Sequence, residues 1–186
     1  MSAEVETYRF SVEEFNKLGE AGIFDENDRV ELLDGEIIVM SPIGSEHAAT
    51  VLRIGWYFQQ RLGEQVLTST QNPTVIDEFS EPQPDLMLLK LKADFYKRAH
   101  PRPDDILLLV EVSDTTLGYD RGPKLRKYAE CGVREVWIVN LKKAMIEQFC
   151  SPSLSEYAIS QNYRRGESIA LTAFREVTFQ VDELIG

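Results

Sequence analysis

The residues of this chain that could do chemistry are carboxylates set inside apolar segments. Glu111 lies near the end of ILLLVEV, residues 106–112, the most apolar run of the chain, which predicts a strand buried on both faces. An ionised carboxylate in such a strand is costly unless it is paired, hydrogen-bonded or bound to a metal. Ligands also tend to bind at the C-terminal ends of strands in open α/β sheets. Glu111 is therefore either an ion-pair partner or part of a site.

Asp85 repeats this pattern, because it follows Pro84 and leads into the apolar residues LMLL. A lone aspartate at such a place is commonly a strand-edge residue with a turn hydrogen bond, and that interpretation stays open. Two carboxylates on adjacent strands, however, could share one cation. Oxygen ligands suit a hard ion such as Mg²⁺ or Mn²⁺. Asp85 and Glu111 are therefore candidate metal ligands.

A third acid, Glu31, lies among apolar residues in the first strand of a predicted hairpin. Its side chain should point to the face opposite Val30 and Leu32. At a shared site, Glu31 could hold a second metal ion or order a metal-bound water. Otherwise it is a half-exposed strand residue.

Lys124 lies on the helix expected after the Glu111 strand, with Tyr128 one turn later on the same face. A lysine beside a metal-bound water can orient that water and stabilise charge that develops on a phosphate. The alternative is a surface lysine on an amphipathic helix. Arg126 and Lys127 are expected to point outward.

Other catalytic arrangements are absent or weak. The chain has two histidines, His47 and His100, and no GxSxG motif, which argues against a Ser–His–Asp triad. It has no P-loop and no GxGxxG motif. His47 begins a predicted helix and reads as a terminal polar residue. Ser113 and Asp114, just after the Glu111 strand, could cap the loop or assist at the site.

Local patterns predict the elements that must position these residues. A capping box precedes the first helix, and Asp34-Gly35 between two apolar runs is a strong hairpin signal. The predicted helices cover 12–18, 45–62 and 122–131, the hairpin covers 29–40, and strands are expected near 66–70, 74–76, 84–89, 106–112, 133–140, 145–149, 156–159 and 168–171. The helix between the strands at 106–112 and 133–140 makes a βαβ unit, so these two strands should be parallel.

The composition fits one domain, residues 1–186, with a substantial core. The net charge of −11 counts against a protein that coats nucleic acid, although an enzyme could still engage nucleic acid locally. Basic residues gather over 90–102 and over 121–127, and each group could be a solvated face. The two cysteines form no CxxC pair, no run is apolar enough to cross a bilayer, and no signal peptide is recognisable. We therefore expect a cytoplasmic protein without a membrane partner.

The order of the candidate residues resembles the PD-(D/E)XK nuclease superfamily, in which an upstream acid precedes a Pro-Asp and a later strand carries an acid, any residue and a lysine. More closely, the chain is similar to the Uma family (Uma-two) of restriction-endonuclease-like proteins over about residues 8–182. The segments that carry this similarity are ELLDGEIIVMSP (31–42), PDLMLL (84–89), LLVEVSDTT (108–116) and DRGPKLRKYAECGVREVWIVN (120–140).

The resemblance implies an α/β, restriction-endonuclease-like core with a mixed central sheet flanked by helices. It implies metal-dependent hydrolysis of phosphodiester bonds, with DNA as the expected substrate. Our hypothesis is that Asp85, Glu111 and the backbone carbonyl of Val112 hold one Mg²⁺ or Mn²⁺. Ser113 stands where the superfamily motif has its lysine, and the resemblance assigns that lysine to Lys124 instead.

Two further expectations concern partners. Nucleases that cut both strands are commonly dimers, so we expect a homodimer, and the acidic surface favours recruitment by a protein of unknown identity. The main alternative to an enzyme is a catalytically inactive nuclease-like domain that binds nucleic acid or protein, which the missing lysine at Ser113 and the negative charge both favour. A third possibility is a structural domain whose acids are paired internally.

Overall fold

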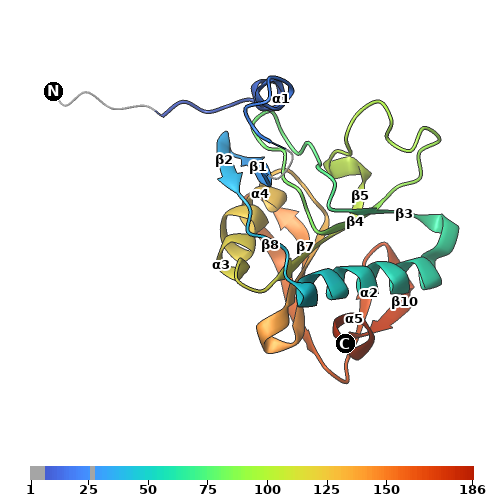
Figure 1. Cartoon of the computed structure of the whole chain (residues 1–186). Coiled ribbons are helices and arrows are strands. Elements are labelled where there is room, and N and C mark those ends of the chain that lie inside the picture. Colours follow the sequence, from blue (N-terminus) through green and yellow to red (C-terminus); the bar gives the residue numbers. More distant parts are fainter. Residues whose placement is uncertain (1–6, 26–27) are drawn as a thin grey trace.

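The computed structural model describes residues 7–25 and 28–186, and a six-stranded mixed sheet forms its centre (Figure 1). The strand order is β3 (Leu67–Thr70), β4 (Leu86–Leu89), β5 (Ile106–Ser113), β6 (Glu135–Asn140), β7 (Met145–Ser153) and β8 (Glu156–Arg164). The β5–β6 pair is parallel and the other neighbouring pairs are antiparallel. The predicted βαβ unit and its parallel strands are therefore confirmed.

Apolar side chains cover both faces of this sheet. On one face, α2 (Ser45–Leu62), α5 (Val181–Ile185) and the hairpin of β9 (Ser168–Leu171) and β10 (Phe174–Gln180) bury a cluster that includes Phe58, Trp137 and Phe179. On the other face, α4 (Leu125–Glu130) buries a second cluster around Tyr128 and Ile138. Successive residues of β6 alternate between the two clusters, as a strand buried on both faces requires.

The hairpin of β1 (Val30–Leu33) and β2 (Glu36–Val39) stands beside the sheet as a separate two-stranded unit (Figure 1). Its turn residues, Asp34 and Gly35, have φ angles of 52° and 79°, which confirms the turn predicted from the Asp-Gly pair. A side chain at Gly35 would also meet Arg9, since a Cβ there would lie 2.6 Å from the Arg9 Cβ. The helix α1 (Val12–Glu20) precedes the hairpin and carries the predicted capping box of Ser11 and Glu14.

The crossover from β5 to β6 differs from the expected single helix over 122–131. It contains a short helix α3 (Leu117–Tyr119), a π-helical turn (Asp120–Lys124) and α4. Pro123 lies inside the π-helical turn, where the wider winding accommodates a residue that cannot donate a backbone hydrogen bond. Asp120 and Lys124, at the ends of this turn, are both buried.

One other expectation fails, and two elements were not foreseen. Residues 74–76 do not form a strand of a sheet, because their backbone amides bond to loop carbonyls instead: Thr74 N–H to Pro82, Val75 N–H to Pro101 and Ile76 N–H to Ser80. The elements β10 and α5 were not predicted. Three short 3₁₀ turns complete the described structure, at Gly63–Gln65, Pro103–Asp105 and Leu141–Lys143. Across the described residues, none of the helices has the length and apolarity to cross a membrane.

Candidate active site

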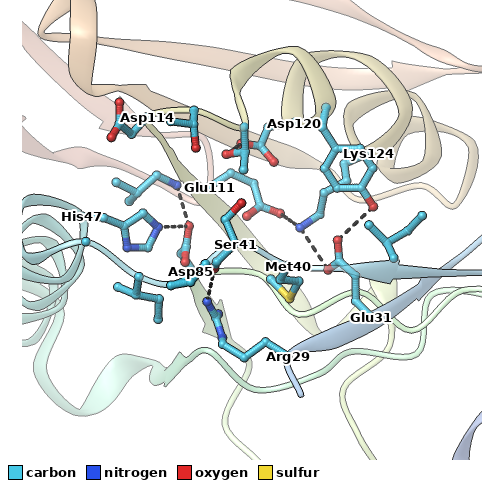
Figure 2. Close-up of a pocket in the computed structure, with 18 of the residues that line it drawn as sticks. Arg29, Glu31, Met40, Ser41, His47, Asp85, Glu111, Asp114, Asp120 and Lys124 are labelled. Atoms are coloured by element: carbon cyan, nitrogen blue, oxygen red, sulfur yellow. Dashed lines mark hydrogen bonds and ion pairs between the residues drawn. The ribbon is translucent and has the colours of Figure 1, made fainter. Parts of the chain in front are cut away.

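All four predicted catalytic side chains line one cavity of about 250 Å³ (Figure 2). Glu31 comes from β1, Asp85 from the residue before β4, Glu111 from β5 and Lys124 from the end of the π-helical turn. The cavity therefore lies where the hairpin, the sheet and the crossover helices meet. All four side chains are nearly inaccessible to solvent.

Asp85 and Glu111 are neighbours because of the strand register. Strands β4 and β5 are antiparallel with Leu86 opposite Val110, so the residue before Leu86 lies beside Glu111. The Asp85 carboxylate also takes the place of a backbone carbonyl beside β5, since its Oδ2 accepts a hydrogen bond of 2.8 Å from Val112 N–H. In an extended strand, the N–H and C=O of one residue point to the same side. The carbonyl of Val112 is therefore directed toward the side on which Asp85 lies.

Asp85 is also held by side chains. Its Oδ2 lies 3.0 Å from His47 Nε2, and its Oδ1 accepts a longer bond of 3.3 Å from Gln71 Nε2. Burial raises the pKa of Asp85, but the hydrogen bonds and charge of His47 and the Val112 N–H outweigh burial and lower it. Asp85 is therefore an ionised carboxylate that faces the cavity.

Glu111 is buried and is held by two side chains. Its Oε1 accepts hydrogen bonds from Tyr128 OH at 2.6 Å and from Lys124 Nζ at 2.8 Å. Burial raises the pKa of Glu111 to about 8; Lys124 opposes this rise, and the neighbouring carboxylates add to it. Burial thus favours the protonated form of Glu111, and the positive charge of Lys124 favours the ionised form.

Lys124 bridges two of the acids. Its Nζ lies 2.8 Å from Glu111 Oε1 and 3.2 Å from Glu31 Oε2 (Figure 2). Burial lowers the pKa of Lys124, but the carboxylates of Glu111, Glu31 and Asp120 outweigh burial and raise it well above its ordinary value. Lys124 is therefore a permanent cation. Glu31 is fixed in turn by Tyr119 OH and by the backbone N–H of Gln83, each 2.9 Å from one of its oxygens.

The structure adds residues that sequence reasoning underrated. His47, on the first turn of α2, contacts Asp85 directly, and its Nδ1 is buried without a hydrogen-bond partner. Ser113 occupies the strand position of the superfamily lysine but donates a hydrogen bond of 2.7 Å to Asp120, another acid that lines the cavity. Tyr119 was not foreseen. The signal available for His47 was its place at the start of a predicted helix that follows the Glu31 hairpin.

The prediction that Lys127 points outward is wrong. Its Nζ lies 2.6 Å from Asp34 Oδ1 and 2.5 Å from Asp77 Oδ2, and Lys127 is buried. These ion pairs tie the turn of the β1–β2 hairpin to α4. Arg121 of the same basic group is paired with Glu147. The group over 121–127 is thus mostly internal, and Arg126 is its exposed member, as predicted.

The residues that line the cavity fit a hard divalent cation in chemistry. In the described residues, no group of three or more His, Cys, Asp and Glu side chains is arranged to hold a metal ion. The hypothesised ligand set is smaller, with the two side chains Asp85 and Glu111 and the Val112 carbonyl. All of its donors are oxygens, which Mg²⁺ and Mn²⁺ prefer. Burial is the main cause of the raised pKa of Glu111, and the neighbouring carboxylates add to it; a bound divalent cation would favour the ionised form.

Comparisons with known proteins identify the family and the fold class of this chain. A family model, Uma2, described as "Putative restriction endonuclease", matches residues 12–182. Among solved structures, the fold is similar to a "putative nuclease belonging to DUF820" from Anabaena variabilis, with a TM-score of 0.71 and 11% identity over 95% of this chain and 97% of that chain. No curated protein sequence matches the chain. The structural likeness confirms the predicted restriction-endonuclease-like fold class. The chain therefore belongs to the Uma2 family of restriction-endonuclease-like nucleases.

Proposed function

We propose that this chain is a metal-dependent endonuclease that hydrolyses phosphodiester bonds in DNA. One observation carries the proposal: the Lys124 ammonium lies between Glu31 and Glu111 and lines one cavity with Asp85, although the four residues come from distant parts of the chain. The residue types of the PD-(D/E)XK pattern thus meet in space even though Ser113 replaces the strand lysine. Membership of a nuclease family supports the reaction class.

The expected cofactor is Mg²⁺ or Mn²⁺, held by the carboxylates of Asp85 and Glu111 and by the Val112 carbonyl. Such an ion, when bound, polarises a phosphate and lowers the pKa of a water ligand. Three protein contacts position the carboxylates for this role. His47 and Val112 N–H both bond Asp85 Oδ2, and Tyr128 OH bonds Glu111 Oε1, so neither side chain is free to rotate.

Lys124 supplies a fixed positive charge in this proposal. Because the surrounding carboxylates raise its pKa well above the ordinary value, it keeps its protons and is not a general base. It acts as a donor that orients the attacking water and stabilises the charge that develops on the phosphate. Glu31 holds Lys124 in position, and Tyr119 and Gln83 hold Glu31.

The test is a cleavage assay with supercoiled plasmid, linear duplex DNA, single-stranded DNA and RNA, with Mn²⁺, with Mg²⁺ and with EDTA. We expect cleavage of DNA that requires the metal and falls by about 100-fold in Asp85→Asn and in Lys124→Met. Lys97→Met is the matched control, because Lys97 is an exposed lysine outside the cavity.

Cleavage by Asp85→Asn at the wild-type rate would remove the assignment of the site. Failure of the wild type to cut any substrate, despite binding of nucleic acid, would favour the alternative of an inactive binding module. Cleavage of RNA but not DNA would keep the site and change the substrate.

A further inference from the structure

One wall of the cavity is apolar, although acids line the same cavity and Ile38 of this wall is the cross-strand neighbour of Glu31. The apolar wall comes from β2 and the segment that leads into α2, and its members are Ile38, Val39, Met40, Pro42 and Ile43. Val39 is 80% exposed and Ile43 is 38% exposed, so these side chains stand at the mouth of the cavity in contact with solvent. Apolar side chains take no direct part in the hydrolysis of a phosphodiester. They can, however, pack against the flat face of a nucleobase, as apolar and aromatic side chains do in nucleic-acid-binding proteins.

The cavity offers few cations to a nucleic acid. Among the residues that line it, the basic side chains of lysine and arginine are Arg29 and Lys124, and Lys124 is engaged by Glu31 and Glu111. Among the described residues, Arg29 donates one side-chain hydrogen bond, from Nη1 to the Ser41 carbonyl at 2.8 Å, which fixes it beside the apolar wall (Figure 2). A guanidinium has five N–H donors, so Arg29 can still bind a phosphate.

The two basic groups over 90–102 and 121–127 add few free cations near the cavity. Residues 90–102 follow the C-terminal end of β4, whereas Asp85 precedes its N-terminal end, so this group lies away from the acids. In the other group, Arg121 and Lys127 are paired with carboxylates of the fold. A protein that grips duplex DNA neutralises several phosphates on both strands with lysine and arginine. Near the cavity, Lys142 is a further exposed lysine, and its Nζ lies 3.6 Å from Asp114 of the lining. Among the described residues, the surroundings of this cavity therefore offer few free cations to a duplex.

We infer that the cavity takes a single unpaired DNA strand, with one base on the apolar wall and one phosphate at Arg29, and does not take an intact duplex. The inference rests on the proposed function for the reaction and goes beyond it in naming the form of the substrate. A narrow cavity that reads one nucleotide is typical of enzymes that act on unpaired or extruded nucleotides. An intact duplex would first have to open, which costs free energy that a few contacts here cannot supply.

The test measures binding separately from cleavage. A fluorescein-labelled DNA oligonucleotide, alone or annealed to its complement, is titrated with the protein in EDTA and followed by fluorescence anisotropy. We expect the single strand to bind at least about 10-fold more tightly than the duplex, and the Val39→Asn/Ile43→Asn variant to lose about 10-fold in affinity for the single strand. Both side chains are exposed, so the variant should fold.

Two controls make this result specific. Leu154→Asn removes a side chain that is 90% exposed and does not line the cavity, and it should bind the single strand like the wild type. Arg29→Gln should weaken binding and flatten its dependence on salt. Equal affinity for single strand and duplex, unchanged binding by the Val39→Asn/Ile43→Asn variant, or no binding of either DNA would each overturn the inference.

Cleavage in Mn²⁺ separates this inference from the proposed function. If the duplex is cut as fast as the single strand, the substrate inference fails and the nuclease proposal stands. If the single strand is bound preferentially but never cut, the nuclease proposal fails and the binding inference stands.

Discussion

Replacement of Lys124 by methionine should destabilise the protein strongly, because Lys124 is the cation that compensates two buried acids. Lys124, Glu31 and Glu111 are 2%, 1% and 3% exposed. Removal of one partner from a buried ion pair typically costs about 3–5 kcal/mol. Glu111 can keep a proton at neutral pH, since burial raises its pKa to about 8, so it need not be left as an unpaired buried charge. We therefore expect a loss near the lower limit, about 3 kcal/mol at pH 7, or about 10 °C in Tm.

The loss should depend on pH. Without Lys124, the pKa of Glu111 rises further in the folded state, because Lys124 opposes the effect of burial, so the folded state binds protons more tightly than the unfolded state. The free energy of unfolding of the variant then falls as pH rises above the ordinary glutamate pKa of about 4.5. The difference between wild type and Lys124→Met should accordingly be small at pH 5 and larger at pH 9.

The assay is urea unfolding in EDTA at pH 5, 7 and 9, followed by the fluorescence of the buried Trp137. Lys97→Met, a change at an exposed lysine, should stay within about 0.5 kcal/mol of wild type at each pH. Equal stability of Lys124→Met and wild type at pH 7 and 9 would refute the reasoning that Lys124 compensates the buried acids.

Three further predictions follow from the same contacts. The free energy of unfolding of Glu111→Gln should rise relative to wild type as pH rises from 5 to 9, because wild-type Glu111, with a pKa of about 8, must lose its proton and glutamine carries none. Urea unfolding at pH 5 and pH 9 measures this difference, and a difference independent of pH would contradict the prediction. Lys127→Met should lower the free energy of unfolding by about 2 kcal/mol, which is less than the loss of a fully buried ion pair because Asp34 is half-exposed. An unchanged Tm would contradict this. Burial raises the pKa of Cys131 to about 12, so its thiol should react with a disulfide reagent at pH 8 far more slowly in the folded protein than in urea, and equal rates would contradict this.

The sequence was most informative where local chemistry decides the structure. The Asp34-Gly35 pair predicted a turn because both residues tolerate positive φ, and the structure has such a turn. The helix over 45–62 begins and ends as predicted, since its apolar periodicity stops at Gly63. The proximity of Asp85 and Glu111 follows from two apolar strands that each carry one acid near the same edge of the sheet.

Features that depend on distant partners were beyond sequence reasoning. Lys127 is buried because Asp34 and Asp77, 93 and about 50 positions away in the chain, converge on it, and the helical pattern contains no trace of either. His47 reaches Asp85 for the same reason, through the packing of α2 against the sheet. Residues 74–76 resembled a strand in composition, but their amides bond to loop carbonyls, and no local pattern distinguishes these cases.

The π-helical turn has a local and a distant cause. Pro123 within a predicted helix signalled a break or a first turn, but not a wider winding. The turn brings Asp120 and Lys124 into the cavity, where their charges meet those of the hairpin and the sheet. Functional sites often hold such irregular helical turns, and the position of Lys124 depends on this one.

The central claim is that Asp85 and Glu111 bind a divalent cation, and calorimetric titration with Mn²⁺ tests it most directly. The samples are the wild type, the Asp85→Ala/Glu111→Ala double variant and the control Glu176→Gln, which removes an exposed acid outside the cavity. Mn²⁺ should bind the wild type and the control at one site and should not bind the double variant. Equal binding by all three, or no specific binding by a folded wild type, would contradict the claim and leave the acids with a structural role.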